Sequence, residues 1–362
     1  MNNGLDDVVA AETTLSDVDG AAGRLLIRGR SLDELAGAVR YEDVLELLFS
    51  GFFIGLPNAD HLALALGEAR AQVFSRLPAA AAFLNLPVTE AVRALIAQIA
   101  DGDDLAAALR LIAAPAVFAP AIIRMKRGDA PVVPDPASTH AADVLRMLHG
   151  ETVAPDWAAA LDAYFVTVSD HGLNASTFAA RVVASTHAGL TSAVLAAISA
   201  LKGPLHGGAP GPVLDMLDEI GRPEAAEAWL EAALDKGDRL MGFGHRVYRV
   251  RDPRADALKQ AARRLAKSTR SGAGRFALAE SIEAAALAIL ARRKPNRPLK
   301  TNVEFYTALL LEALGFPRDS FTSVFAMGRS SGWIAHAKEQ ALTGRLIRPQ
   351  SRYVGPLPER AA

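Results

Sequence analysis

A histidine in a glycine-rich loop is the first feature of this sequence that points to catalysis. His206 lies in the segment KGPLHGGA, just before a helix that we expect to begin near Gly211. The segment lacks the Gly-Lys-Ser/Thr ending of a phosphate-binding P-loop. A helix N-terminus lowers the pKa of an imidazole and keeps it neutral, so that it can donate a hydrogen bond to a developing oxyanion. A turn with an incidental histidine is the alternative interpretation.

A second cluster, GFGHRVYRVRDPR over residues 242–254, combines His245 with four arginines. Its first two glycines resemble a dinucleotide-binding motif, but the third glycine is absent and no strand precedes it, so we reject that interpretation. Guanidinium groups bind carboxylates and phosphates through two parallel hydrogen bonds. The cluster therefore indicates anion binding, with a solvated basic loop as the alternative.

A third cluster, KTNVEFY over residues 300–306, places Glu304 in the first turn of an apolar helix. A carboxylate there is favourable for the helix dipole alone, so the local sequence does not by itself predict a general base. Arg329 in GRSSGWIAH and Arg348 in LIRP are isolated arginines further along the chain. Isolated arginines usually lie on the surface.

Composition narrows the classes of function. The chain has 362 residues, 51% of them hydrophobic, which is enough for two domains with a sizeable core. The 39 basic and 40 acidic residues nearly balance, so we expect neither nucleic acid nor an anionic membrane as a partner. The absence of cysteine excludes disulfides and thiolate sites. The acidic N-terminus shows no signal-peptide pattern, and we expect a cytoplasmic protein.

Alanine and leucine dominate, and the apolar periodicity predicts helix almost everywhere. The best-marked helices are expected at 31–49, 141–148, 156–168, 224–234, 254–265 and 281–292. Asp252-Pro253 predicts a helix start, and the Asp19-Gly20 turn between 12–18 and 24–28 predicts a β-hairpin. The uncharged stretch 182–201 contains several Ser, Thr and Gly residues, which favours a buried helix over a membrane span.

Two breaks divide the chain. Residues 205–212 form a Gly/Pro-rich, hinge-like stretch, and a second break falls at 315–317. We therefore predict a small helical domain, 206–313, set into a large one made of 1–205 and 314–362. The Pro-rich segment 127–138 is expected to be an exposed connection.

Taken in order along the chain, these segments resemble the citrate synthase family, which includes 2-methylcitrate synthase. The resemblance runs from GLDDVVAAETTLSDVDGAAGRLLIRG through DHGLNASTFAARVVAS, LKGPLHGGA, GFGHRVYRVRDPR and NVEFYTALLLEALGFP to GRSSGWIAHAKEQ and RLIRPQSRYVGP. It implies an all-α, two-domain fold with a short N-terminal β-hairpin. It also implies a homodimer, with each active site lying between the domains and completed by the partner subunit. Acetyl-CoA and oxaloacetate would be the substrates, with no metal and no separate cofactor.

The resemblance also implies roles for individual residues. The catalytic residues would be His206, which stabilises the enolate, His245, which polarises the ketone, and Glu304, the base. The oxaloacetate ligands would be His171, Arg254, Arg329 and, reaching across from the other subunit, Arg348. The coenzyme A contacts would be Leu240, Met241, Gly242, Phe243, Gly244, Arg249, Lys300 and Asn302.

One position departs from the family pattern, which has Asp where this chain has Glu304. The extra methylene moves the carboxylate by about 1 Å, and such a displacement can cost on the order of a hundredfold in rate. We expect the surrounding backbone to compensate. Two alternatives stay open: a 2-methylcitrate synthase, whose acyl preference turns on about 1–3 kcal/mol in the pocket, and a CoA- or oxaloacetate-binding protein without turnover.

Overall fold

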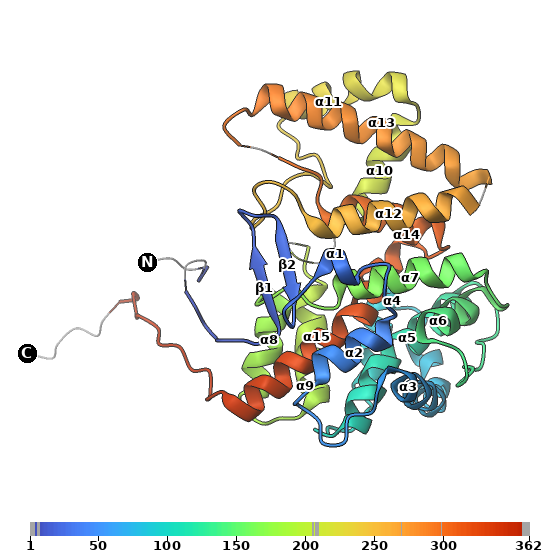
Figure 1. Ribbon diagram of the computed structural model, residues 1–362, viewed down its shortest axis with the longest axis vertical. Helices are drawn as coiled ribbons and strands as arrows, with labels where there is room; N and C mark the ends of the chain where they lie inside the picture. Colours follow the sequence, from blue (N-terminus) through green and yellow to red (C-terminus); the bar gives the residue numbers. More distant parts are fainter. Residues whose placement is uncertain are drawn as a thin grey trace, which may run out of the picture.

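The computed structural model describes residues 4–5, 8–204, 206, 210–268, 270–297 and 299–356, and helices make up most of it. The strands are β1 (Ser16–Asp19), β2 (Arg24–Ile27) and β3 (Arg30–Ser31). The helices of the lower part in Figure 1 are α1 (Leu32–Leu35), α2 (Tyr41–Phe49), α3 (Ala59–Phe74), α4 (Val88–Ile96), α5 (Leu105–Lys126), α6 (His140–His149), α7 (Pro155–Val168), α8 (Ala175–Ala184), α9 (Leu190–Leu201) and α15 (Phe321–Thr343). Those of the upper part are α10 (Pro210–Ile220), α11 (Ala226–Asp235), α12 (Pro253–Ser268), α13 (Arg270–Arg293) and α14 (Val303–Ala313). Short 3₁₀ turns are η1 (Leu77–Phe83), η2 (Pro223–Ala225) and η3 (Arg318–Ser320).

The lower part is built around α5 and α15. Helix α15 packs against α5, α7, α8 and α9, so that its residues from Phe321 to Ala337 are almost all buried. Helix α5 is apolar on every side and is long enough to cross a membrane, but 89% of its most apolar window is buried against neighbouring helices. Its side chains therefore contact protein, as expected for the central helix of a large core.

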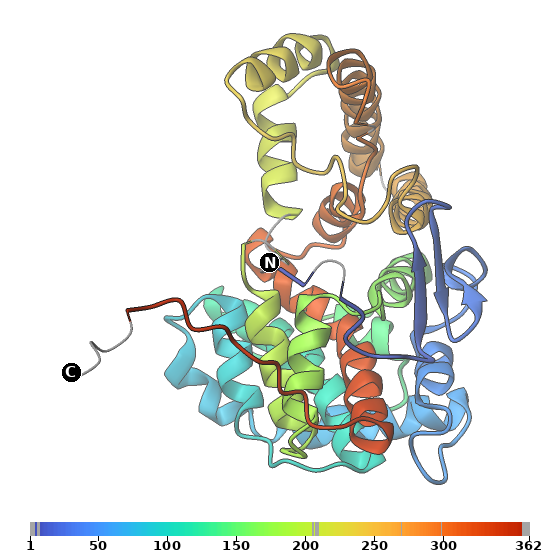
Figure 2. The same ribbon diagram turned by 90° about the vertical axis from the view of Figure 1, so that its left-hand side faces the viewer.

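The upper part is a separate group of helices in Figures 1 and 2, reached through α10 and left through α14. Helix α12 packs against α14 of the upper part and against α7 of the lower part, and so joins the two groups. The two groups of helices therefore share a boundary at α12. The domain limits 206–313 and 314–362 themselves stay a prediction.

The hairpin stands beside this boundary. Strand β1 pairs antiparallel with β2, with Ser16 opposite Ile27, and β2 pairs with the short β3, which the sequence had not indicated. Figures 1 and 2 both show the closed end of the β1–β2 hairpin next to the chain that leads into α12. The all-α fold with a short N-terminal hairpin is confirmed, although β1 is shorter than the predicted strand 12–18.

Most predicted helices are confirmed, including those at 141–148, 156–168, 224–234 and 254–265, while 281–292 forms part of the longer α13. The single helix predicted at 31–49 is wrong. The chain forms α1 and α2 instead, because Gly37 adopts a left-handed φ of +75° and Arg40 an extended conformation. The carboxylate of Asp43 then accepts the backbone N–H of Arg40 at 2.8 Å and starts the second helix.

The single buried helix predicted at 182–201 is also wrong. The stretch divides into the end of α8 and the whole of α9, with His187 and Gly189 at positive φ between them. A Cβ on Gly189 would lie 2.5 Å from Oδ1 of Asp101, so only glycine lets the two segments approach. The Asp101 carboxylate accepts the N–H of Ser192 in the first turn of α9.

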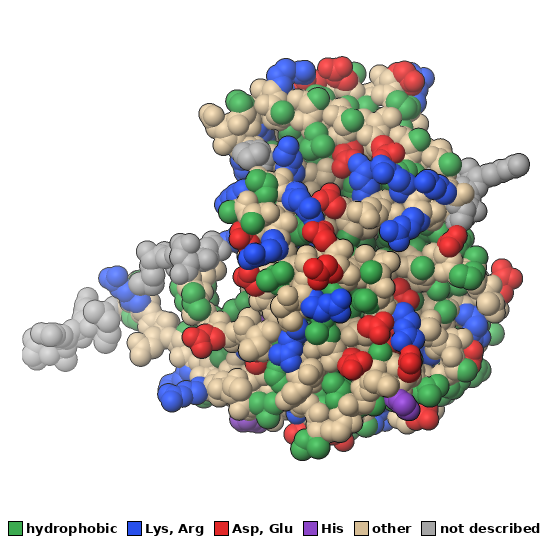
Figure 3. Space-filling view, in the orientation of Figure 1, with side chains coloured by type: hydrophobic (Ala, Val, Ile, Leu, Met, Phe, Trp, Pro, Cys, Tyr) green, Lys and Arg blue, Asp and Glu red, His purple; other side chains and the backbone are tan. Residues whose placement is uncertain are grey.

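Charge is mixed over the surface. Figure 3 shows acidic and basic side chains interspersed on one face, with a group of basic ones over α12. That helix exposes Arg263, Arg264 and Lys267, and Arg263 is paired with Glu280. The pattern agrees with the formal net charge of −1.

Candidate active site

His206 precedes α10 and is held by the first turn of α8. The backbone N–H of Ser176 lies 3.3 Å from its Nε2, and the Ser176 hydroxyl lies 2.8 Å away. A backbone N–H can only donate, so Nε2 is the acceptor and the neutral ring carries its proton on Nδ1. Burial, together with the charge of Arg329, lowers the pKa of His206 to about 4. The predicted neutral imidazole is thus supported, with burial and the charge of Arg329 as its causes. The neighbouring residues 205 and 207–209 lie outside the described residues.

His245 is fixed by the backbone of its own loop. The N–H groups of Val247 and Tyr248 point at its Nδ1, at 3.1 and 3.2 Å. The ring proton of the neutral form therefore sits on Nε2, where Nη2 of Arg254 lies only 3.0 Å away. Two N–H donors lie side by side at that point, and an acceptor oxygen bound beside them would receive both. Burial, with the charge of Arg254, lowers the pKa of His245 to about 4.

Asp252 organises this corner of the site. Its buried carboxylate accepts Nε and Nη2 of Arg254, each at 2.9 Å, and the backbone N–H of Arg254 at the start of α12. It also accepts the N–H of Val303 at the start of α14. One carboxylate thus caps two helices and aligns the guanidinium, which also lies over the Tyr248 ring. The sequence prediction used Asp252 only as a helix start.

Glu304 lies in the first turn of α14, as predicted. The side chain of its N-cap residue, Asn302, accepts its backbone N–H at 3.1 Å. Burial raises the pKa of Glu304 to about 7, while the charge of Arg254 lowers it and that of Asp252 raises it. At neutral pH a carboxyl with this pKa is divided between the acid and the base forms, which suits proton abstraction.

His171 and Arg329 come from the lower part and lie toward the same boundary. Nε2 of His171 lies 3.1 Å from the hydroxyl of Tyr248, and its ring is 5.8 Å from that of His245 in an edge-on arrangement. Arg329 is buried, and its Nε donates to the carbonyl of Val168. Burial lowers the pKa of Arg329 to about 10, so that the group stays charged at neutral pH.

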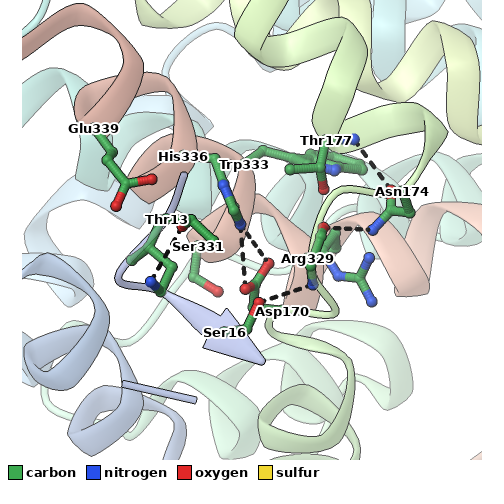
Figure 4. A network of polar contacts seen from close by, with 12 residues as sticks. Thr13, Ser16, Asp170, Asn174, Thr177, Arg329, Ser331, Trp333, His336 and Glu339 are labelled. Carbon is green, nitrogen blue, oxygen red and sulfur yellow. Dashed lines mark hydrogen bonds and ion pairs between the residues drawn. The ribbon is translucent and has the colours of Figure 1, made fainter. Parts of the chain in front are cut away.

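A buried polar network behind His171 was not predicted. Arg181 donates from Nε to His336 at 3.0 Å, and His336 contacts both carboxylate oxygens of Asp170 at 3.2 Å. Figure 4 shows His336 pointing at Asp170, with Trp333 and Arg329 on the same helix, α15. The network fixes the turn that carries His171. Its members come from α8, α15 and the turn after α7, so no local pattern in the sequence could reveal it.

The loop predicted to bind coenzyme A, Leu240 to Gly244, is held by the segment before α14. The N–H of Gly244 donates to the carbonyl of Lys300 at 2.7 Å, and the N–H of Asn302 donates to the carbonyl of Gly242 at 2.9 Å. Both glycines have φ near +85°, and a Cβ on Gly242 would lie 2.8 Å from the ring of Phe305. The predicted residues of both segments are therefore brought together, with Met241 and Phe243 half-buried between them.

A cavity of about 350 Å³ opens beside this loop. Its walls include the apolar side chains of Leu240, Phe243 and Leu299. It is also lined by one acidic residue, Asp238, and by four basic residues: Arg239, Arg246, Lys294 and Arg297. Of the basic residues, only Arg246 belongs to a cluster predicted from the sequence. An apolar slot with four cations suits a ligand that joins a flat ring to phosphate groups.

Two predicted ligands lie apart from this arrangement. Arg249 is exposed, and its backbone N–H donates to Gly20 of the hairpin. Arg348 is exposed on an extended segment, 344–356, that leaves the body after α15 in Figure 2. Among the described residues, no group of three or more His, Asp or Glu is arranged to hold a metal ion. The expectation that the reaction needs no metal stays a prediction.

Comparisons with known proteins identify the family of this chain. Residues 4–350 match the family model described as citrate synthase, C-terminal domain. The chain belongs to the citrate synthase family. A putative citrate synthase 2 of Mycobacterium tuberculosis is 41% identical over 98% of this chain and 93% of its own length. A 2-methylcitrate synthase of the same organism is 36% identical over 98% of this chain and 91% of its own length.

A solved citrate synthase of Thermoplasma acidophilum, in a ternary complex with carboxymethyl coenzyme A and oxaloacetate, superposes with a TM-score of 0.86. It is 27% identical and covers 100% of this chain and 98% of its own.

Proposed function

We propose that this protein condenses acetyl-CoA with oxaloacetate and hydrolyses the resulting thioester, giving citrate and free coenzyme A. The observation that carries the proposal is the position of Arg254. Its guanidinium contacts His245, is aligned by Asp252 and lowers the pKa of Glu304 through its charge. One cation thus links a candidate substrate-binding histidine to a candidate base.

Each step has a residue with suitable chemistry. Glu304 takes a proton from the acyl methyl group while Nδ1–H of His206 donates to the thioester oxygen, which becomes the enolate. The methyl carbon attacks the ketone of oxaloacetate, whose oxygen accepts from Nε2–H of His245 and takes up a proton. Water then cleaves the thioester, leaving citrate and the free thiol.

Binding requires several cations because oxaloacetate is a dianion. We assign its carboxylates to Arg254 and Arg329, with His171 beside them and Arg348 of the partner subunit completing the site. Coenzyme A would occupy the cavity beside the loop 240–244, with its adenine against the apolar wall and its phosphates at the four basic residues. Arg249, Lys300 and Asn302 flank the same loop.

The direct test is release of thiol from acetyl-CoA that depends on oxaloacetate, with citrate identified by mass spectrometry. The matched variant is Glu304→Gln, which keeps the size of the side chain and removes the base, and its turnover should fall by about a thousandfold. Oxaloacetate binding measured by calorimetry should change little. Binding without any thiol release from the native protein would refute the proposal in favour of a non-catalytic binding protein.

Glu304→Asp tests the departure from the family pattern. If the surrounding backbone has adapted to the longer side chain, Asp withdraws the carboxylate by about 1 Å and turnover falls by about ten- to a hundredfold. A gain in turnover would contradict the expected compensation.

Propionyl-CoA is the second candidate substrate, since one relative is named a 2-methylcitrate synthase. The discrimination depends on one methyl group. Values of kcat/KM for acetyl-CoA and propionyl-CoA, measured side by side, decide between the two functions. A propionyl-CoA value higher by tenfold or more would replace the first proposal with the second.

The homodimer is tested by complementation. Arg348→Leu and His245→Ala should each be inactive alone, but a mixed dimer contains one site with a native His245 and a native Arg348. Random reassociation should then restore about a quarter of the native activity. Failure to recover activity when mixed dimers form would exclude the shared site.

A further inference from the structure

The N-terminal hairpin contacts both loops that carry the candidate oxaloacetate-binding histidines. We propose that the β1–β2 hairpin is a positioning element of the active site, which holds the loop 245–251 of the upper part against His171 of the lower part. The proposal rests on the assignment of His171 and His245 to oxaloacetate.

The base of the hairpin contacts the turn after His171. The hydroxyl of Ser16 accepts the N–H of Gly172 at 2.9 Å, and Ser16 lies next to Asp170 in Figure 4. Gly172 has a φ of +61°, and a Cβ there would lie 3.2 Å from the Val18 side chain. The strand therefore packs closely on the turn and also satisfies one of its donors.

The tip of the hairpin contacts the other loop. The carbonyl of Gly20 accepts the N–H of Arg249 at 2.9 Å. A Cβ on Gly20 would lie only 2.2 Å from the carbonyl oxygen of Val247. The carboxylate of Asp19 accepts the N–H groups of Ala21 and Ala22, which fixes the turn that presents Gly20. The backbone of Gly20 thus contacts the backbone of the loop 245–251 directly. No flexible side chain lies between them that could move to make room for an added methyl group.

These two contacts give the strand a defined role. From Ser16 to Gly20 the extended chain spans about 13 Å, at roughly 3.3 Å a residue. It joins a turn of the lower part to a loop of the upper part across the boundary between them. The strand therefore acts as a spacer between the two loops.

The contact at the tip reaches His245 through the backbone. Val247, against which Gly20 packs, and Tyr248 present the two N–H groups that hold Nδ1 of His245. These bonds set the ring orientation and keep its proton on Nε2, toward the oxaloacetate oxygen. The hydroxyl of Tyr248 also contacts His171. A shift of the loop 245–251 would therefore misdirect both histidines.

The decisive variant is Gly20→Ala. Gly20 has no left-handed φ, so the substitution acts through the contact with Val247 and not through backbone strain. The loop must move by several tenths of an ångström or more, and we expect kcat to fall by about ten- to a hundredfold. The dissociation constant of oxaloacetate, measured by calorimetry, should rise about tenfold.

The matched control is Gly274→Ala in α13, where a Cβ meets nothing within 4 Å. It should leave kcat and oxaloacetate binding unchanged. At the base of the hairpin, Ser16→Ala should weaken oxaloacetate binding, and Ser16→Thr, which keeps the hydroxyl on a residue that favours strands, should restore it. If the hairpin only stabilised the fold, Ser16→Ala would lower Tm, but kcat measured well below Tm would not change. Ser16→Thr would then restore no oxaloacetate binding.

The outcomes separate this inference from the proposed function. If the native protein binds oxaloacetate but releases no thiol, the proposed reaction is refuted. Calorimetry of oxaloacetate binding to the Gly20 and Ser16 variants still tests the role of the hairpin. Native values of kcat and of the oxaloacetate dissociation constant in folded Gly20→Ala overturn the inference. If Gly20→Ala does not fold, native oxaloacetate binding in Ser16→Ala overturns it instead.

Discussion

The pH dependence of turnover follows directly from the environment of Glu304. Burial raises the pKa of this carboxyl from 4.5 to about 7. The ionised form is the base, so activity should be present above pH 7 and lost as the pH falls through that value. With one group of pKa about 7, roughly a tenth is ionised at pH 6 and nine-tenths at pH 8. The expected rise in kcat between these values is therefore close to tenfold.

The titration of the two histidines should not obscure this rise of kcat with pH, which forms the acid limb of the pH profile. Burial lowers the pKa values of His206 and His245 to about 4, so both rings are neutral throughout the range from pH 5.5 to 8.5. The assay is thiol release at saturating acetyl-CoA and oxaloacetate, in buffers of constant ionic strength. The residual rate of Glu304→Gln should show no such limb.

The result that would refute this reasoning is a kcat that stays flat from pH 6 to 8 and declines only near pH 4.5. Glu304 would then be ionised as if exposed, and burial could not be what tunes it. A limb near pH 7 that persists in Glu304→Gln would assign the titration to another group.

Three further outcomes are expected. His206→Ala should cut kcat by about a hundredfold or more and leave oxaloacetate binding within a factor of about two, because its partner is the acyl oxygen; calorimetry and thiol release separate the two effects. Arg329→Leu should weaken oxaloacetate binding by about a hundredfold at unchanged KM for acetyl-CoA, and a raised KM for acetyl-CoA alone would contradict the assignment. Gly242→Ala, which brings a Cβ to 2.8 Å from Phe305, should raise the KM for acetyl-CoA and spare oxaloacetate binding, and Gly274→Ala serves as the control.

Much of the fold could be predicted because its signals are local. The helix start at Asp252-Pro253 and the turn at Asp19-Gly20 depend on residues adjacent in sequence, and the structure confirms both. The break within 31–49 depends on Gly37 adopting a positive φ, and a glycine in an otherwise helical pattern does not reveal that conformation. The two helices predicted as continuous, 31–49 and 182–201, are therefore each divided in the structure.

For the candidate site too, local motifs could be predicted from the sequence, and contacts between distant segments could not. The histidines and Glu304 stand in short motifs, so resemblance to a family could select them. Asp252 had been recognised only as a cap, because its second helix, at Val303, lies far along the chain. The basic residues that line the cavity, which include Arg239 and Lys294, come from separate helical ends whose proximity only the fold creates.

Two segments that are 325 residues apart in sequence meet at one carboxylate, that of Glu339. It accepts the N–H of Thr14 at 2.7 Å and pairs with the buried Arg181. Glu339 is synthesised 325 residues after Thr14, so the segment around Thr14 cannot dock until α15 has been made. Since Ser16 follows two residues later, prematurely terminated chains lack the anchor that seats the hairpin. Incomplete products should therefore be unable to sequester oxaloacetate in the cell.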